Sequence, residues 1–302
     1  MLKQSTKSIA SRRFLQSISY LFFLFLCFSF LLPSVSAATL LTGAGKLWGW
    51  DSATKSYSGG LGNHSCAVVS GGVKCWGDNY SGQLGNNSTT DSPAAVDVKD
   101  NAGTANLSGI VAVGLGASHT CALTTGWGVK CWGSNEYGQL GDGNGASGAQ
   151  SLLPVDVTGL TSGVSAIAVG ENHTCALVSG GVKCWGTNGN GQIGDAATIG
   201  GWGVGWGSTG AGTVTIIRTT PSDVAGLGSG VTAIAAGNGH SCALMSNTQV
   251  KCWGWNNTGQ LGRGSLLDTV DPFTNPVDVV TNTTGPVYLT GVVALGASID
   301  YT

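Results

Sequence analysis

Charged side chains are scarce in this sequence, where they make up 9% of the 302 residues. After the first 37 residues there is no basic run or patch, and such a patch is the electrostatic footprint of a nucleic-acid-binding protein. There is also no second apolar segment of membrane-spanning length. We therefore expect no nucleic acid as a partner and no membrane span in the mature chain.

Catalytic motifs are also missing. The sequence shows no Ser/His/Asp set, no pair of carboxylates and no Cys-x-x-Cys redox motif. Its Gly-Gln-Leu-Gly phrases lack the spacing and the lysine of a phosphate loop, and GDGNG from Gly141 lacks the acidic ladder of a calcium loop. These absences predict a protein that is not an enzyme and holds no cofactor or metal. An extracellular enzyme stays open as an alternative, because groups that converge only in the folded chain escape a search of this kind.

The first 37 residues are organised differently from the rest of the chain. Four basic residues precede an apolar run over residues 20–28, and the small residues Val35, Ser36 and Ala37 follow it. This layout predicts a secretory signal peptide over residues 1–37, cleaved after Ala37, and hence a protein that is secreted or held at the cell surface. An uncleaved membrane anchor is the alternative, although the apolar run is short for a span. Without the leader, nine Lys and Arg face fifteen Asp and Glu, a formal charge of −6.

The chain is rich in glycine (51), in tryptophan (10) and in internal repetition. A phrase of the form His-x-Cys-Ala-Leu/Val, followed after a short gap by Val-Lys-Cys-Trp-Gly, occurs four times. Its copies begin at His64, His119, His173 and His240. An apolar run ending in glycine precedes three of the copies. A turn-rich phrase such as SNEYGQLG from Ser134 follows each copy, and a proline-led strand such as PVDV from Pro154 leads into the next unit.

Each unit predicts a small antiparallel sheet, because its segments are short apolar or alternating strands bounded by Gly, Asn, Ser or Pro. One such sheet cannot bury its own faces, so several must stack as a propeller or a solenoid. GKLWGWD from Gly45 resembles the back of a unit, and GVVALGASIDYT from Gly291 resembles the front. We predict one all-β domain over residues 38–302, closed into a five-bladed ring by pairing of residues 47–50 with residues 291–301. An open, incomplete arc is the alternative.

The two cysteines of each unit lie on opposite arms of a predicted hairpin. Pairing Cys175 with Cys184 leaves a four-residue loop, and where the spacing is one residue longer the extra residue falls in that loop. Directly opposed residues are close enough for a disulfide, and export provides oxidising conditions. A zinc site is the alternative, but His-x-Cys and the facing Cys supply only three ligands. We predict four bridges that use every cysteine of the mature chain: Cys66–Cys75, Cys121–Cys131, Cys175–Cys184 and Cys242–Cys252. The histidines are interpreted as packed, hydrogen-bonded repeat residues.

The repeated motifs A-x-G, H-x-C-A-L, W-G-x-N-x-x-G-Q-L-G and P-V-x-V resemble those of the regulator of chromosome condensation repeat family, over essentially all of residues 38–302. This resemblance implies a β-propeller, which in that family typically has seven blades with one repeat in each. It also implies two different functions. Secreted members include a β-lactamase inhibitory protein, whereas the founding member is a guanine-nucleotide exchange factor for a small GTPase. The signal peptide and the paired cysteines favour the first kind of role, and exchange activity is the alternative.

One segment, residues 196–220, departs from the repeat and lengthens its unit by 12–13 residues. Trp202 and Trp206 lie in it and occupy no repeat position. The segment is either an elaborated connection that packs on the adjoining blade or a projecting loop that offers aromatic anchors to a partner. We predict a non-catalytic module that binds another protein or a cell-surface glycan through its loops, with Trp202 and Trp206 as the binding residues.

Overall fold

The computed structural model describes six stretches of the chain. These are residues 40–41, 56–58, 62–196, 216–264, 273–282 and 287–297. The chain divides into two units, Met1–Ala38 and Thr39–Thr302, and all described residues belong to the second unit.

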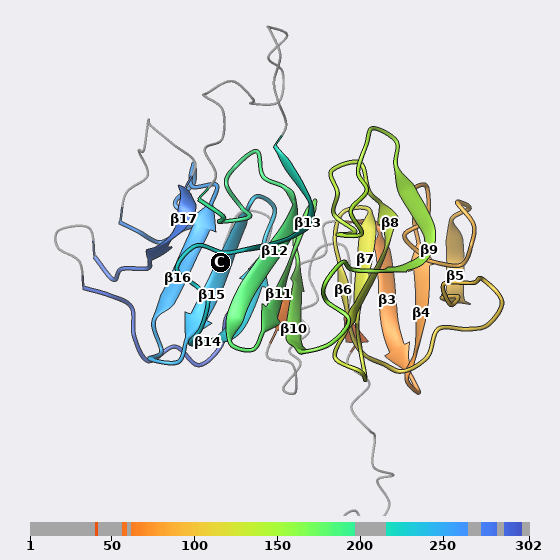
Figure 1. The fold of residues 1–302 in the computed structure, drawn as a ribbon, viewed down its shortest axis with the longest axis horizontal. Helices are drawn as coiled ribbons and strands as arrows, with labels where there is room; N and C mark the ends of the chain where they lie inside the picture. Colours follow the sequence, from red (N-terminus) through yellow and green to blue (C-terminus); the bar gives the residue numbers. More distant parts are fainter. Residues whose placement is uncertain are drawn as a thin grey trace, which may run out of the picture. The chain divides into compact units, whose positions relative to one another are not determined.

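The described residues form an all-β fold of four sheets, with no helix among them (Figure 1). Each sheet corresponds to one sequence unit and is called a blade here. Blade 1 contains β1 (Leu40–Leu41), β3 (His64–Val69), β4 (Gly72–Gly77) and β5 (Ser92–Asp97). Blade 2 contains β6 (Ile110–Leu115), β7 (His119–Thr124), β8 (Val129–Ser134) and β9 (Gln150–Asp156). Blade 3 contains β10 (Val164–Val169), β11 (His173–Val178), β12 (Gly181–Thr187) and β13 (Ile217–Asp223). Blade 4 contains β14 (Val231–Ala236), β15 (His240–Met245), β16 (Val250–Gly254) and β17 (Phe273–Asp278), with β2 (Ser56–Ser58) added at one edge.

The second and third strands of every blade form the predicted hairpin. In blade 3 they pair with Cys175 opposite Cys184 and Val178 opposite Gly181. Blade 2 keeps the same register through Cys121 and Cys131, and its extra residue lies in the turn. The cysteine register therefore holds because a longer spacing changes only the turn and leaves the strand alternation unaltered.

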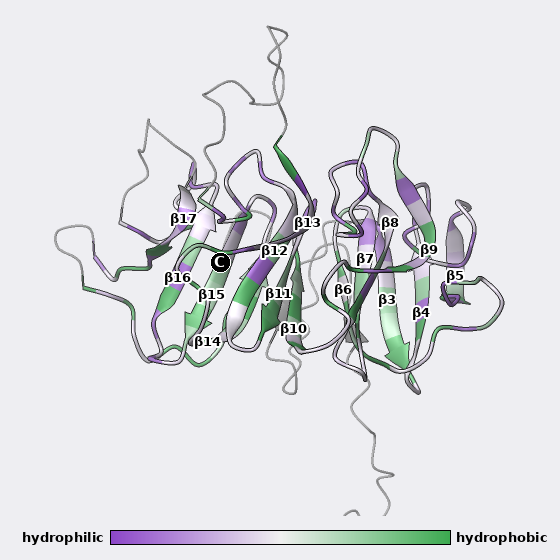
Figure 2. Ribbon diagram, viewed as in Figure 1, coloured by the Kyte–Doolittle hydropathy of each residue, from purple (hydrophilic) through white to green (hydrophobic). Residues whose placement is uncertain are grey.

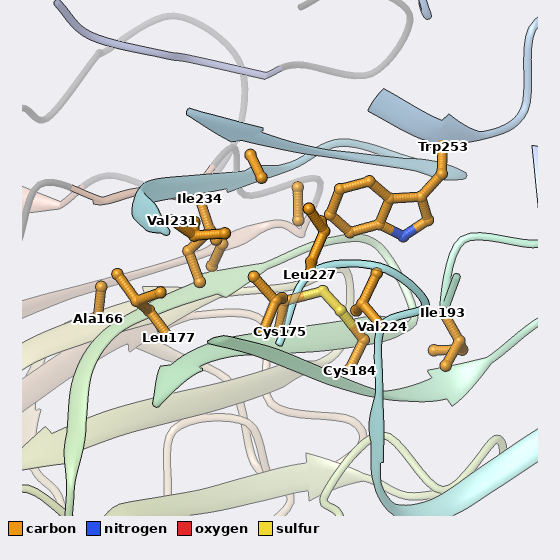
Figure 3. Packing of buried hydrophobic residues seen from close by; sticks show 14 residues of the cluster. Ala166, Cys175, Leu177, Cys184, Ile193, Val224, Leu227, Val231, Ile234 and Trp253 are labelled. Atoms are coloured by element: carbon orange, nitrogen blue, oxygen red, sulfur yellow. A yellow bond between two sulfur atoms is a disulfide. The ribbon is translucent and has the colours of Figure 1, made fainter. Parts of the chain in front are cut away.

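Consecutive blades pack against each other through apolar side chains. The alternation of the strands directs one set of residues toward the following blade and one set toward the preceding blade. Figure 3 shows the interface of blades 3 and 4, where the Cys175–Cys184 bridge and Leu227 lie beside the indole of Trp253. In Figure 2 hydrophobic residues are concentrated in strands such as β3, β10 and β14. The core is thus a series of layers, three between consecutive blades and one between blade 4 and residues 289–297, with one disulfide at each layer.

The antiparallel strands separate the loops into two sets. The turns between first and second strands and the loops between third and fourth strands lie on one side, which we call the loop face. The hairpin turns between second and third strands and the connections to the next blade lie on the other side, the hairpin face.

The described charges outside the strands differ between the faces. On the loop face they are Asp78, Asp91, Glu136, Asp142, Glu171, Asp195 and the cation Arg263, and on the hairpin face Lys99 and Asp100. Each blade also has a Lys–Asp ion pair at the hairpin end of its third and fourth strands, such as Lys130 with Asp156. The loop face is therefore acidic, whereas the charges toward the hairpin face are balanced.

The two ends of the domain use pairings that the repeat pattern did not predict. β1 takes the first-strand position of blade 1 by pairing with β3, and β2 pairs in parallel with β14. Near the other end, Leu295 and Ala297 are buried against blade 4, although no strand forms over the described residues 289–297. Residues 47–50 lie outside the described residues, so closure of a five-bladed ring stays a prediction.

Candidate functional site

Four disulfides are present, one in each blade, as the cysteine spacing predicted. They join Cys66 to Cys75, Cys121 to Cys131, Cys175 to Cys184 and Cys242 to Cys252, each across a Cα–Cα distance of 4.1 Å. All eight cysteines are at most 1% exposed. Within the part of the chain that the structure describes, no group of three His, Cys, Asp or Glu side chains could hold a metal ion. The bridges are structural cross-links between the central strands of each blade.

Each bridge should stabilise its blade and resist reduction while the protein is folded. Closing a loop of about ten residues contributes roughly 2–3 kcal/mol in the chain-entropy description. We expect the double variant C175A/C184A to lose free energy of unfolding of about that size in a denaturant titration. Non-reducing peptide mapping should recover only the four intra-blade bridges, and a bridge between blades would contradict the assignment.

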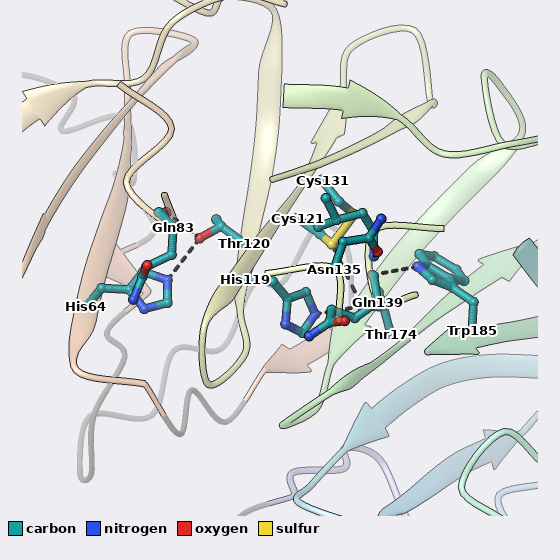
Figure 4. Close-up of a disulfide and its surroundings, with 11 residues drawn as sticks. His64, Gln83, His119, Thr120, Cys121, Cys131, Asn135, Gln139, Thr174 and Trp185 are labelled. Atoms are coloured by element: carbon teal, nitrogen blue, oxygen red, sulfur yellow. Dashed lines mark hydrogen bonds between the residues drawn. A yellow bond between two sulfur atoms is a disulfide. The ribbon is translucent and has the colours of Figure 1, made fainter. Parts of the chain in front are cut away.

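The four histidines lie at the blade seams, where they are at most 1% exposed. Nε2 of His64 lies 2.9 Å from Oγ1 of Thr120 in the next blade, and His119 makes the equivalent contact with Thr174 at 3.0 Å (Figure 4). His173 contacts the hydroxyl of Ser241 in the same way at 2.9 Å. Thr120 donates its own hydroxyl proton to the Gln83 carbonyl, so it can only accept from the histidine. The imidazole is therefore the Nε2–H tautomer. The histidines are hydrogen-bonded repeat residues, as predicted.

Burial keeps these imidazoles neutral. It lowers the pKa of His64 and His240 to about 4 and the pKa of His119 and His173 to about 3, with neighbouring histidines adding to the effect for the latter two. A group that stays neutral down to such acidity and is closed to solvent is poorly suited to exchange protons with a substrate at neutral pH. The four histidines therefore have a structural role.

Sequence reasoning missed the residues that complete each seam. A tryptophan of the following blade donates to the carbonyl of the loop glutamine: Trp132 to Gln83 and Trp185 to Gln139, both at 2.9 Å. At Gln83 this is the same carbonyl that accepts from the Thr120 hydroxyl. Figure 4 shows Trp185 directed at Gln139 in this way. The signal was present in the sequence, because the residue between His and Cys is always Ser or Thr and a tryptophan always follows the second cysteine. Each seam thus combines an imidazole, a hydroxyl and an indole around one loop.

The Asn-x-x-Gly-Gln-Leu-Gly loops use most of their polar groups internally. The Asn135 side chain accepts from the Leu140 N–H and donates to Asp142, and Gln139 accepts from the Tyr137 N–H. Asp142 also receives the Asn144 side-chain amide, so this loop is organised by amide donors. The two residues after the asparagine differ from blade to blade, and some of them are exposed, such as Tyr80, which is 82% exposed. These loops are rigid supports with variable tips.

One such tip brings the only two glutamates of the chain near a tyrosine. Burial, followed by the charges of Glu136 and Glu171, raises the pKa of Tyr137, and burial raises the pKa of Glu171. All three residues lie on the acidic loop face.

The irregular segment of blade 3 leaves this same loop face, and its base is fixed. Arg218, near the C-terminal end of the segment, makes an ion pair of 2.5 Å with Asp195, just before the segment. Asn188 donates its side-chain amide to Asp195 at 3.3 Å and its backbone N–H to Ile216 at 2.8 Å. The predicted binding residues Trp202 and Trp206 lie outside the described residues. The structure therefore places the two ends of the segment and no part of its tip.

The four blades define a β-propeller repeat protein, and the comparisons assign its family. The description "Regulator of chromosome condensation (RCC1) repeat" matches residues 70–123 and 129–177, and a second version of this repeat matches residues 110–139, 164–192 and 231–260. The chain belongs to the RCC1 repeat family.

Relatives and solved structures agree with this assignment. The Ultraviolet-B receptor UVR8 of Arabidopsis thaliana is 30% identical over 70% of this chain and 55% of its own length, and human HERC4, a probable E3 ubiquitin-protein ligase, is 32% identical over 70% of this chain and 18% of its own. The crystal structure of Prp20p from Saccharomyces cerevisiae has a TM-score of 0.61 at 20% identity, covering 89% of this chain and 56% of that one. The chain thus spans about half the length of UVR8 and Prp20p and a smaller part of HERC4.

Relatives of this family have regulatory or protein-binding roles. Prp20p is described with binding properties to Gsp1p and histones, and a further structure contains Kap60 bound to it.

Among the described residues of the present chain, no helix is long and apolar enough to cross a membrane.

Proposed function

We propose that this chain is an exported, non-catalytic binding module that holds a partner protein, or a glycan at a cell surface, on its loop face. The observation that carries the proposal is the anchored irregular segment. The repeat residues form the contacts between blades. Residues 197–215 depart from the repeat, and the ion pair of Asp195 with Arg218 joins the two ends of this stretch. Loops on a rigid scaffold are where binding residues concentrate.

Export is part of this proposal. Four bridges that use all eight cysteines of residues 38–302 suit an oxidising compartment, and the N-terminal layout is that of a secretory leader. Sequencing the N-terminus of protein recovered from the medium or the cell surface should give Ala38 as the first residue. Nucleotide exchange on a small GTPase would need a cytosolic substrate and rests on likeness of fold alone.

The double variant W202A/W206A tests the binding role. Tryptophans at an interface centre contribute about 2 kcal/mol or more, so we expect at least a 30-fold loss of affinity for a partner cross-linked on the native cell surface. The melting temperature should change by less than about 2 °C, since the repeat residues are untouched. R218A is the matched control for the base of the segment. A double variant that keeps its partner but loses several degrees would show that the tryptophans only pack on a blade.

A further inference from the structure

We propose that Trp127, on the hairpin face, is a stacking platform for a neutral saccharide, a second binding site independent of the loop face. Trp127 is 51% exposed and is the most exposed tryptophan that the structure describes. The repeat tryptophans, in contrast, are 0% exposed in blades 2 to 4. An aromatic side chain left open on a hairpin tip is not explained by packing of the blades.

The backbone at Trp127 is in a conformation that a bulky residue rarely adopts. Its φ is 61°, and Thr248 has a φ of 67° at the matching place in blade 4. This is the left-handed position of a three-residue hairpin loop, where glycine is favoured. Ser70 and Ser179 also have a positive φ in the hairpin turns of blades 1 and 3, so the conformation belongs to the repeat, and only the use of a tryptophan for it is particular to blade 2.

Two hydrogen bonds hold Trp127 in this place. Its N–H donates to the Thr124 carbonyl, and its own carbonyl accepts from the N–H of Val164 at the start of the next blade, both at 2.9 Å. The adjoining Gly128 packs so closely that a Cβ there would lie 2.5 Å from the Thr161 carbonyl oxygen. The indole is therefore presented from a fixed support, which lowers the entropic cost of binding.

The surroundings of Trp127 are polar and carry no net charge. Thr125 and Gly126 precede it in the turn, and Thr161 and Ser162 lie on the connection that contacts this turn; all four are exposed. The nearest charges in the same blade are Lys130, three residues along the chain, and Asp156, at the end of β9; they form an ion pair of 2.6 Å with each other.

This combination fits the chemistry of a neutral sugar. The C–H groups on one side of a pyranose ring carry partial positive charge and lie well against the negative face of an indole. Hydroxyl side chains beside the ring can exchange hydrogen bonds with sugar hydroxyls. A charged ligand is disfavoured because Lys130 and Asp156 already neutralise each other in their ion pair.

The test uses the full mature protein and a panel of neutral oligosaccharides: cello-, chito-, laminari- and manno-oligosaccharides, with the corresponding insoluble polymers. We expect saturable binding of at least one series, and binding to the polymer as well would identify a surface glycan as the source. W127T introduces the residue that blade 4 carries at the same backbone position, so it should fold with an unchanged melting temperature and lose at least tenfold in affinity. W127F should keep most of the binding, because an aromatic face remains.

The outcomes separate this site from the loop face. W202A/W206A should leave saccharide affinity unchanged, whatever it does to a protein partner. Thr248→Ala, at the matching tip of blade 4, should also have no effect. If no neutral saccharide binds at millimolar concentration, or if W127T binds as well as the wild type, the proposal is wrong. Loss of a protein partner in W127T, without any saccharide binding, would identify the hairpin face as a protein interface instead.

Discussion

Lowering the pH from 7 to 5 is expected to remove most of the stability of the folded protein. The chain has four histidines, and burial holds the pKa of all four at about 3 to 4 in the folded state. In the unfolded chain their pKa is about 6.5. Between these limits the unfolded state binds protons that the folded state does not, so the free energy of unfolding falls as the pH falls.

The expected effect is large compared with ordinary protein stability. A pH of 5 is about 1.5 units below the pKa of each histidine in the unfolded chain and still above its pKa in the folded protein. Each histidine therefore lowers the free energy of unfolding by about 2 kcal/mol at this pH. Four of them cost on the order of 8 kcal/mol, against a usual total of about 5–15 kcal/mol. The stability they contribute is fully present above about pH 6.5 and is lost progressively toward pH 4.

Denaturant titrations at several pH values between 7 and 5 measure this directly. The free energy of unfolding, plotted against pH, should approach a slope of about 5 kcal/mol per pH unit, which corresponds to the uptake of four protons on unfolding. The variant H119Q is the control: it lowers the slope by one proton, whatever its effect on stability at pH 7. A free energy of unfolding that stays flat over this range would contradict the neutral, buried state of the histidines.

Much of the blade could be predicted from the sequence because its signals are local and repeated. The pairing of Cys175 with Cys184 follows from strand alternation over nine residues, and the same alternation predicts the hairpin. The two N-terminal strands could not be predicted, since β1 and β2 are two and three residues long and pair with distant strands. Two or three residues carry no usable periodicity.

The repeated ion pairs between third and fourth strands show a different limit. Lys183 lies 2.6 Å from Asp223, and the other blades contain the equivalent pair. Both residues are visible in the Val-Lys-Cys and Pro-x-Asp-Val phrases, but the register between these strands depends on a bulge at the tryptophan, as between Cys184 and Gly186. The inter-blade contacts of histidine, hydroxyl and tryptophan likewise join residues 37 to 68 positions apart. Recurrence alone gives no distance between such residues.

Replacing Trp185 by alanine is expected to destabilise the protein far more than the same change at Trp76. Trp185 is 0% exposed between blades 2 and 3 and donates to the Gln139 carbonyl, whereas the equivalent Trp76 of blade 1 is only partly buried. Removing a buried tryptophan costs about 3–5 kcal/mol through lost burial and the cavity left behind. For Trp76 we expect about 1–2 kcal/mol, because less surface is buried and water can fill the space.

Chemical unfolding of W185A and W76A under identical conditions gives the comparison, and W185F separates the two contributions at the seam. Phenylalanine keeps most of the apolar contact but leaves the Gln139 carbonyl without its indole donor, so W185F should cost about 1–3 kcal/mol. If W185A and W76A lost equal free energy of unfolding, Trp76 would have to be as deeply buried as Trp185. A larger loss at Trp185, with an intermediate value for W185F, would instead show that stability resides in the seams between blades, where each blade depends on the loop of the one before it.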